Sequence, residues 1–451
     1  MIALEFPPVN TTGCYRYLKF IKYLGENNVE TSVVMPTIED LIHLHPNAKV
    51  DTDLLKKIPE NVKIIQVPLS KRIEFTKSKI TLQSKISHYL NYKGNDVARA
   101  WSKNLNTFIS EYLKKEKVDI IFVSVPPFSL GVLVCKIFKR MHIPIIFDFR
   151  DEWSMNKGSV FPTYFHYKYA KRNEKKIFKK GSAIISVTSR IIELFKKLHP
   201  EINPSKFHLI TNGFDLETVN TESFDNVPYK KGEKFIIGQA GAYYYNPQSN
   251  ITAKLPFYKR SGIKKITYRQ DLSIEDWLYQ SPLYFLKALS ILFIRRPDLK
   301  NIVEFHNIGH TPNWLLQMIE QFSLESNFIA HGFLKKSENL ALQRSFNVLL
   351  YTAEKITNGE QYCLSSKIFD YVLMKRPILG FVTEGEVKDF IEKSGCGVTC
   401  DPDDEFEASQ KIELLIENQI RFTPNQDFLL KFQAQNLSQE LRKVIDIIIQ
   451  K

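Results

Sequence analysis

The sequence predicts an α/β protein with two doubly wound domains, each built around a parallel sheet. Its 451 residues are too many for one ordinary hydrophobic core and suggest two domains of roughly 200 residues each. Short apolar runs alternate with amphipathic segments in both halves, which is the pattern of βαβ units. A polar stretch over residues 215–234 interrupts this alternation. We therefore predict an N-terminal domain over residues 1–220, a C-terminal domain over residues 221–430 and a final helical segment over residues 431–451.

In the first domain, each expected strand is a short apolar run, and each expected helix has one apolar face. The predicted strands are residues 2–6, 30–35, 118–123, 143–147, 183–187 and 208–211, and the predicted helices are residues 15–24, 128–140 and 189–198. Strands joined in this way by helices indicate a parallel sheet.

The second domain repeats the alternation. Its predicted strands are residues 235–240, 302–305, 347–351 and 378–382, and its predicted helices are residues 282–294 and a short helix that carries Lys367. The final segment is predicted to be helical over residues 438–450. Pro377 ends the short helix. The apolar run directly after this proline is typical of a buried parallel strand.

Charge is distributed unevenly along the chain, whose net charge is +13. Residues 1–225 hold 34 Lys and Arg against 23 Asp and Glu, whereas the remainder holds 28 against 26. The first half is therefore basic and the second is near neutral. With 43% hydrophobic and 25% charged residues, the composition is that of a globular protein.

Cysteine usage and hydropathy indicate a cytoplasmic protein. The five cysteines are scattered and predict reduced, buried thiols rather than a disulfide framework or a zinc site. The longest apolar run, residues 120–135, is interrupted by two prolines and is too short to span a bilayer. Residues 1–6 reach Pro7 and Pro8 too early for a signal peptide.

The short helix after residue 364 carries the strongest functional signal. Ser365 and Ser366 are N-cap candidates, and Lys367 and Asp370 lie three residues apart on one helical face. A helix N-terminus with a cation in its first turn favours an anion, and an acid one turn further on can accept a sugar or ribose hydroxyl. This arrangement suits a nucleotide diphosphate-sugar. The alternative is a surface ion pair between Lys367 and Asp370.

Two loops of the first domain follow predicted strands, where ligands bind in open α/β sheets. The loop 10–13 opens a helix, so the backbone N–H groups around Thr12 and Gly13 could meet a phosphate or a sugar; a plain βα turn is the alternative. The segment from Asp148 to Trp153 places four charged residues after the apolar run 143–147, and we expect these charges in a cleft rather than in the core. The alternative is that Arg150 pairs with Asp148 or Asp151 and caps the next helix.

The segment from Lys367 to Gly380, KIFDYVLMKRPILG, resembles the C-terminal signature of GT-B glycosyltransferases of family 4, the bacterial group 1 glycosyltransferases. The segment from Asp148 to Trp153 is similar to a D-x-R-D-x-W element of a bacterial subgroup. This resemblance implies two Rossmann-like domains that face a central cleft. It also implies that the first domain holds the acceptor, that the second holds the donor, and that the terminal helix crosses back to the first domain.

The resemblance also implies roles for individual residues. Lys367 would neutralise the donor diphosphate, Asp370 would bind ribose, and Ser365 and Ser366 would donate to phosphate oxygens. Tyr362 stands where the usual pattern has a first glutamate, eight residues before Asp370. The remaining implied site residues are the loop residues Thr12 and Gly13 near the donor diphosphate, Gly241 in a glycine turn, Arg150 at an anionic group and Asp151 at the acceptor hydroxyl.

Family members carry a phosphate-binding arginine after that glycine turn, whereas this chain continues into a long insertion, residues 246–280. Four basic residues of the insertion are candidates for this role: Lys254, Lys259, Arg260 and Arg269. A loop of this length is seldom passive, so we expect a lid over the donor or a platform for the acceptor.

The sequence as a whole predicts a retaining glycosyltransferase that moves a sugar from a nucleotide diphosphate-sugar to a hydroxyl acceptor, in cell-surface polysaccharide or glycolipid assembly. No metal is expected, because helix dipoles and cations can neutralise the leaving diphosphate. The basic runs 71–79 and 171–180 are usually solvated helix faces, but they could attract an anionic membrane that carries a polyprenyl-linked acceptor.

Two other classes of protein also fit part of the sequence. A non-catalytic GT-B-like protein that binds nucleotide or sugar remains the main alternative. A nucleic-acid-binding protein has only the basic charge in its favour. No G-x-G-x-x-G motif follows a strand, which argues against an NAD-binding enzyme.

Overall fold

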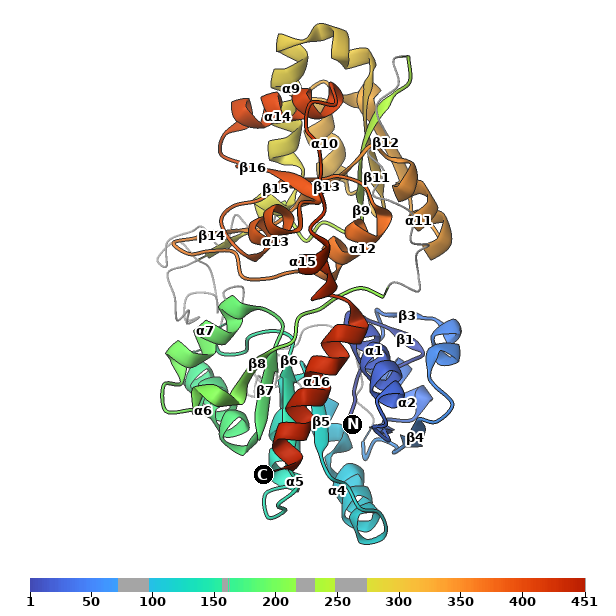
Figure 1. Ribbon diagram of the computed structural model, residues 1–451, viewed down its shortest axis with the longest axis vertical. Helices are drawn as coiled ribbons and strands as arrows, with labels where there is room; N and C mark the ends of the chain where they lie inside the picture. Colours follow the sequence, from blue (N-terminus) through green and yellow to red (C-terminus); the bar gives the residue numbers. More distant parts are fainter. Residues whose placement is uncertain (72–96, 156–160, 162, 216–231, 248–273, 451) are drawn as a thin grey trace, which may run out of the picture. The chain divides into compact units, whose positions relative to one another are not determined.

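The computed structural model describes residues 1–71, 97–155, 161, 163–215, 232–247 and 274–450. They fall into two units, one formed by residues 1–215 and 433–450, and the other by residues 232–247 and 274–432. Each unit has its own sheet and helices (Figure 1). No helix in the described part of the chain combines the length and hydrophobicity that a membrane span needs.

The first unit alternates strands and helices along the chain. Its strands are β1 (Val9–Asn10), β2 (Ser32–Met35), β3 (Lys49–Val50), β4 (Lys63–Gln66), β5 (Ile121–Val125), β6 (Ile145–Phe149), β7 (Ala183–Ser186) and β8 (Phe207–Leu209). Its helices are α1 (Thr12–Glu26), α2 (Ile38–Leu44), α4 (Val97–Lys115), α5 (Phe128–Ile137), α6 (Tyr164–Lys180), α7 (Ser189–Leu198) and α16 (Ala434–Ile449). Strands β5, β6, β7 and β8 pair in that order and in parallel, and β2 pairs in parallel with β4.

The predicted strand over residues 2–6 is wrong in extent. Ile2 alone forms parallel bridges, to Val34 on one side and to Val123 on the other, and so joins the β2–β4 pair to the larger sheet. Pro7 and Pro8 follow directly, and proline has no N–H to donate to a strand ladder. The segment therefore leaves the sheet before a full strand can form.

The second unit is a parallel sheet with a small antiparallel ribbon. Its strands are β9 (Phe235–Ala240), β10 (Ile274–Asp276), β11 (Val303–Ile308), β12 (Phe328–Gly332), β13 (Val348–Thr352), β14 (Lys355–Thr357), β15 (Ile378–Phe381) and β16 (Gly397–Cys400). Its helices are α9 (Leu283–Arg295), α10 (Asn313–Gln321), α11 (Lys336–Ser345), α12 (Ser366–Met374), α13 (Glu386–Ser394), α14 (Glu405–Ile416) and α15 (Gln426–Leu430).

The strand order in the second unit is β12-β11-β9-β13-β15-β16, and β10 pairs with β14 in the ribbon. From β9 the chain continues to β11 on one side, whereas from β13 it continues to β15 on the other. The neighbouring strands β9 and β13 therefore mark the point at which the strand order reverses, where open α/β sheets bind their ligands. The predicted doubly wound parallel sheets are confirmed.

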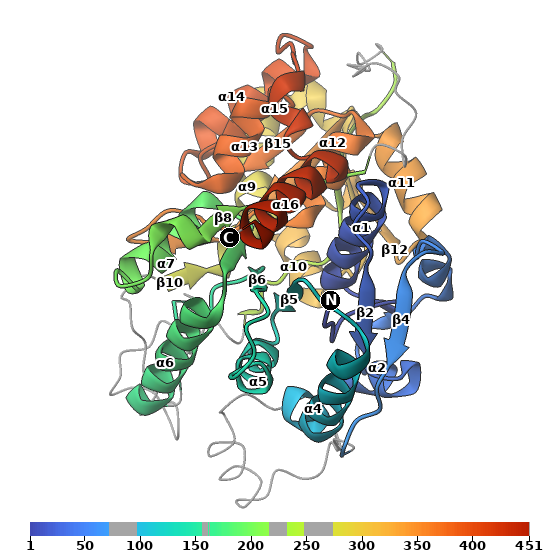
Figure 2. The ribbon, with the colours of Figure 1, turned by 60° about the horizontal axis from the view of Figure 1, so that its bottom comes forward.

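The last helix, α16, belongs to the first unit (red in Figures 1 and 2). It packs on α1 through Leu437, Leu441, Val444 and Ile445, which are spaced as one helical face and join the core around β2. Each buried aliphatic side chain of this kind stabilises the fold by roughly 1.5–3 kcal/mol.

A buried ion pair lies under the carboxyl end of the first sheet. Arg16 of α1 donates to both carboxylate oxygens of Asp148 in β6, at 2.9 and 2.8 Å. Its remaining N–H groups donate to the carbonyls of Ile210 and Thr211, which follow β8. Ser124 of β5 donates its hydroxyl to Asp148 at 2.7 Å. One helix and three strand ends are thereby held together.

This finding corrects the expectation that Asp148 lies in a cleft. Strand β6 extends two residues beyond the predicted run, and the Asp148 side chain is completely buried. A charge in such a place persists because Arg16 and Ser124 satisfy it.

The substitution Arg16→Met is expected to reduce the free energy of unfolding by about 3–5 kcal/mol, because it leaves Asp148 buried without a countercharge. Urea denaturation followed by circular dichroism measures the change. The exposed pair Lys56–Asp53 supplies the control, since Lys56→Met should cost at most about 1 kcal/mol. Equal losses in the two variants would show that the buried pair does not carry the stability assigned to it.

Candidate functional site

The predicted short helix that carries Lys367 is α12, and it begins at the carboxyl end of the second sheet. Ser365 is its N-cap residue, and the hydroxyl of Ser365 lies 2.8 Å from the Tyr351 hydroxyl of β13. Ser366, the first helical residue, is exposed. The first-turn N–H groups of a helix have no partner within the helix and carry a partial positive charge. The α12 start therefore offers backbone donors beside exposed serine side chains.

Lys367 adds a cation to this first turn. Its ammonium group lies 5.5 Å from the centre of the Tyr351 ring, and burial lowers its pKa from 10.5 to about 8. Within the described ranges, Lys367 forms no ion pair with a carboxylate, so the alternative of a Lys367–Asp370 pair is not seen. Asp370 is exposed one turn further along. The ammonium group of Lys367 can therefore bind an anion that comes from outside the chain.

Tyr371 holds α12 over the reversal point of the sheet. Its hydroxyl accepts from the backbone N–H of Ala240 at the end of β9 and donates to the carbonyl of Leu350 in β13. Gly241 follows Ala240 with a φ of +101°, a backbone conformation that favours glycine, and a Cβ there would meet no atom within 4 Å. The glycine turn and the α12 start therefore lie at neighbouring strand ends.

Tyr362 does not present its hydroxyl to solvent. It is 2% exposed, and its hydroxyl donates to Glu275 of β10 at 2.8 Å. Beside it, Gln361 donates to Glu354 and accepts from the backbone N–H of Val387. These contacts fix the loop that leads into α12.

Glu354 was missed in the sequence. It stands two residues after β13, and burial raises its pKa from 4.5 to about 7. An acid directly after a buried strand was the available signal, the same signal that drew attention to Asp151. A carboxyl group with a pKa near neutrality close to a ligand-binding edge is a candidate functional group.

The first unit pairs Arg150 with a partner that the sequence did not indicate. Arg150 donates to both oxygens of Glu5, at 3.2 and 2.8 Å, and to the carbonyl of Pro126. Thr11, the N-cap of α1, also donates to Glu5. Burial alone would raise the pKa of Glu5, but Arg150 and Thr11 hold it below its usual value. The alternative pairing of Arg150 with Asp148 or Asp151 is wrong.

The pair of Glu5 and Arg150 explains why position 13 is a glycine, without the need for a ligand. A Cβ at Gly13 would lie 2.1 Å from a Glu5 oxygen and 2.3 Å from an Arg150 nitrogen. Thr12, the first residue of α1, is exposed. The loop therefore opens a helix as predicted, with Gly13 packed beneath it.

Asp151 lies at the surface of the same unit, directly after Arg150. Its pKa is raised above the usual value, mainly because neighbouring atoms reduce its hydration. The charges of Glu5 and Asp148 act in the same direction, and Arg150 opposes them. A proton therefore stays on this carboxyl at a higher pH than on an ordinary aspartic acid.

Several predicted features fall outside the described residues. These are the basic candidates Lys254, Lys259, Arg260 and Arg269, together with residues 248–273 of the insertion. The end of the insertion is described and forms β10. Across the described ranges, no group of three or more His, Cys, Asp or Glu side chains is arranged to hold a metal ion.

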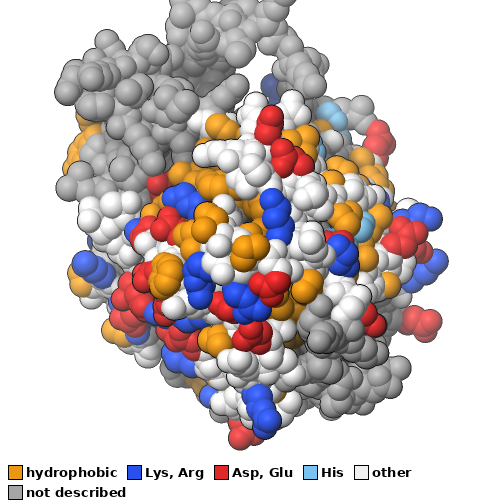
Figure 3. Space-filling model, turned by 90° about the horizontal axis from the view of Figure 1, so that it is seen from above, with side chains coloured by type: hydrophobic (Ala, Val, Ile, Leu, Met, Phe, Trp, Pro, Cys, Tyr) orange, Lys and Arg blue, Asp and Glu red, His pale blue; other side chains and the backbone are white. Residues whose placement is uncertain are grey.

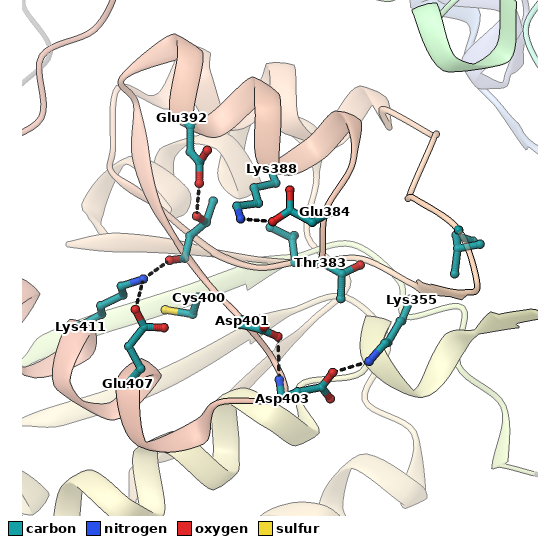
Figure 4. Close-up of a pocket in the computed structure, with 14 residues that line it drawn as sticks. Lys355, Thr383, Glu384, Lys388, Glu392, Cys400, Asp401, Asp403, Glu407 and Lys411 are labelled. Carbon is teal, nitrogen blue, oxygen red and sulfur yellow. Dashed lines mark hydrogen bonds and ion pairs between the residues drawn. The ribbon is translucent and has the colours of Figure 1, made fainter. Parts of the chain in front are cut away.

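A pocket of about 420 Å³ lies at the carboxyl ends of β15 and β16 (Figure 4). Its charged groups are engaged with one another: Lys355 pairs with Asp403, Lys388 with Glu384, and Lys411 with Glu407. None of the predicted donor residues lines it. We therefore place the candidate donor site at the start of α12 and not in this pocket.

Known proteins resemble this chain in fold and, over one segment, in sequence. The family model Glycosyltransferase Family 4 matches residues 87–218. No curated protein matches the chain. Among solved structures, HepE from Anabaena in complex with UDP matches over 98% of both chains, with a TM-score of 0.60 and 12% identity.

Two further solved structures are similar. The lipopolysaccharide outer core galactosyltransferase WaaB matches over 98% of both chains, with a TM-score of 0.56 and 12% identity. WaaG, a glycosyltransferase involved in lipopolysaccharide biosynthesis, matches over 99% of this chain and 98% of its own, with a TM-score of 0.52 and 12% identity. At such identities the likeness establishes the fold. The GT-B fold and the resemblance to family 4 glycosyltransferases are confirmed, and residues 87–218 are the part that the family model matches.

Proposed function

We propose that this chain is a retaining glycosyltransferase that moves a sugar from a nucleotide diphosphate-sugar to a hydroxyl acceptor. The observation that carries the proposal is the cation of Lys367, which has no carboxylate partner in the described part of the chain and stands in the first turn of α12. A diphosphate is the anion whose charge and size suit a helix N-terminus with such a cation. The family 4 match supports the same reaction class.

We assign each donor-binding residue to a different part of the nucleotide-sugar. Lys367 and the first-turn N–H groups of α12 neutralise the diphosphate, Ser365 and Ser366 donate to its oxygens, and Asp370 accepts from the ribose. The glycine turn at Gly241 lets the backbone approach the phosphates. No metal is required in this scheme, because the leaving diphosphate is stabilised by fixed dipoles and a cation.

The transfer breaks the bond between the anomeric carbon and the diphosphate oxygen, and it forms a bond from the acceptor oxygen on the same face of the sugar. The acceptor proton passes to the departing diphosphate. Asp151 faces the acceptor hydroxyl and accepts a hydrogen bond from it. Arg150 acts as a positioning residue, because its pairing with Glu5 fixes the backbone that carries Asp151.

The acceptor that we propose is a saccharide or a polyprenyl-linked saccharide in cell-surface polysaccharide or glycolipid assembly, reached at the inner face of the cytoplasmic membrane. Of the similar solved structures, WaaB is described as a lipopolysaccharide outer core galactosyltransferase and WaaG as a glycosyltransferase involved in lipopolysaccharide biosynthesis. The basic character of residues 1–225 suits an anionic surface.

A second candidate function is nucleotide or sugar binding without catalysis. It is favoured by Tyr362, which stands in place of the family's first acid and whose hydroxyl is engaged by Glu275. Glu354 opposes it, because this residue supplies a nearby carboxyl group that the sequence pattern does not show.

Incubation with a panel of UDP-, GDP- and other nucleotide-sugars is expected to release nucleoside diphosphate from one donor. Lys367→Ala should reduce this release by roughly a hundredfold or more, since it removes the cation that stabilises the leaving group. The control is Lys393→Ala on α13, an exposed residue that pairs with Asp389. Donor binding without turnover would favour the binding protein, and no binding at all would exclude both functions.

Nucleoside diphosphate affinity is expected to depend on pH through Lys367. Its pKa in the free protein is about 8, and a bound diphosphate favours the charged form. Affinity should therefore be full below that value and fall as the pH rises through it, by up to about tenfold per unit. Titration calorimetry between about pH 6.5 and 9.5 measures this dependence.

The matched variant is Lys367→Arg, whose guanidinium stays charged over this whole range. Its affinity should change less with pH than that of the wild type. Identical pH profiles for the two proteins would show that Lys367 does not titrate at the site.

A further inference from the structure

Helix α6 of the first unit carries an unusual excess of positive charge. It contains seven Lys and Arg residues and one acid, Glu174. That acid faces inward and is fully buried, where it accepts from the backbone and hydroxyl of Ser154 and lies 2.9 Å from His199. It cannot neutralise the outer surface of the helix. The cations on α6 therefore face solvent without acids of their own helix.

The exposed residues of α6 form one stripe. Phe165, Lys168, Arg172, Lys176 and Lys179 are all exposed, and they follow one another at intervals of three, four, four and three residues. This spacing places them on a single helical face. The opposite face, which includes Tyr167, Ala170, Ile177 and Phe178, is buried. We call this outer face the α6 stripe.

The α6 stripe has few countercharges. Arg172, Lys176 and Lys179 form no ion pair with a carboxylate in the described ranges. Lys175, at the margin of the stripe, pairs with Glu201 at 2.8 Å. The contrast with the face shown in Figure 3 is plain, because acidic, basic and hydrophobic side chains are interspersed there. Three cations without carboxylate partners among the described residues, Arg172, Lys176 and Lys179, attract a polyanion.

Aromatic side chains stand at the head of the stripe. Phe165 is 80% exposed and Tyr164 is 45% exposed, and the ammonium of Lys168 lies 5.1 Å from the centre of the Tyr164 ring. Exposing the Phe165 side chain to water is unfavourable. Because Phe165 lies beside a row of basic residues, we expect a binding partner that has an anionic surface and an apolar layer beneath it. A bilayer with anionic headgroups has this layering, whereas a nucleic acid backbone does not.

The position of α6 in the unit suits this partner. The helix connects β6 to β7 (Figures 1 and 2). Its first turn therefore lies toward the carboxyl ends of these strands, the edge at which Asp151 follows β6. A lipid surface at Tyr164 and Phe165 would therefore lie on the side of the unit that the proposed function assigns to the acceptor.

We propose that the α6 stripe docks the protein on an anionic phospholipid bilayer, with Arg172, Lys176 and Lys179 against the headgroups and Phe165 inserted at the interface. The inference deepens the proposed function by identifying the surface that meets a membrane-borne acceptor. The contact itself rests on α6 alone, so it can be tested without sugar transfer.

The full-length protein is mixed with vesicles of phosphatidylcholine that contain about one third phosphatidylglycerol, and binding is measured by co-sedimentation. Wild type should bind these vesicles, should release them at high salt, and should not bind phosphatidylcholine alone. Substituting Arg172, Lys176 and Lys179 together by Gln should weaken binding on the order of a hundredfold. Phe165→Ala should weaken it several-fold without changing the salt dependence.

The control replaces one Arg and two Lys that are exposed on the second unit, namely Arg421, Lys300 and Lys431, by Gln. This variant has the same net charge as the α6 variant and should bind vesicles as wild type does. Urea midpoints of all variants verify that they fold. Because the stripe is exposed, nucleoside diphosphate release with a water-soluble acceptor should be unchanged, which separates this proposal from the proposed function.

Equal weakening in the α6 and control variants would overturn the proposal, because total charge rather than the stripe would then account for binding. So would wild-type binding to neutral vesicles alone. Binding to single-stranded nucleic acid with the same dependence on α6, and none to vesicles, would replace the membrane by a nucleic acid partner.

Discussion

The buried pair of Arg16 and Asp148 is the constraint on which the first unit depends. Two charges removed from water are costly unless each finds a countercharge and hydrogen bonds, and here the guanidinium meets the carboxylate and two backbone carbonyls. These groups come from α1, β6 and the segment after β8. The pair therefore fixes the carboxyl edge of the sheet, and the loop with Arg150 and Asp151 starts from a rigid strand end.

Local patterns predicted the fold well where the physical cause is local. Helix α7 and strand β9 were predicted with the bounds that the structure has, because apolar periodicity and flanking polar residues define them. The two errors in the first unit have distant causes. Asp148 was expected outside the core because its partner, Arg16, is 132 residues away in the chain. Ile2 was expected within a longer strand, but its neighbours on both sides are set by tertiary pairing.

Some features of the candidate site could be predicted from the sequence, and others could not. The N-cap at Ser365 and the cation at Lys367 could be predicted, since both follow from short-range rules on helix ends. The turn at Gly241 was expected from the family resemblance. The environments of Glu354 and Tyr362 could not be predicted. Each depends on a segment brought in from elsewhere, either the loop before α12 or the ribbon of β10 and β14.

Arg150 of the first unit has a carboxylate partner within the fold, whereas Lys367 of the second unit has none among the described residues. This difference bears on function. Arg150 pairs with Glu5 and donates to a backbone carbonyl, so its charge is compensated inside the fold. Lys367 is partly buried beside Tyr351, and the described residues offer it no carboxylate, so desolvation lowers its pKa. An anion that enters from solvent would relieve that cost. The lowered pKa of Lys367 therefore agrees with a helix end that binds an anion.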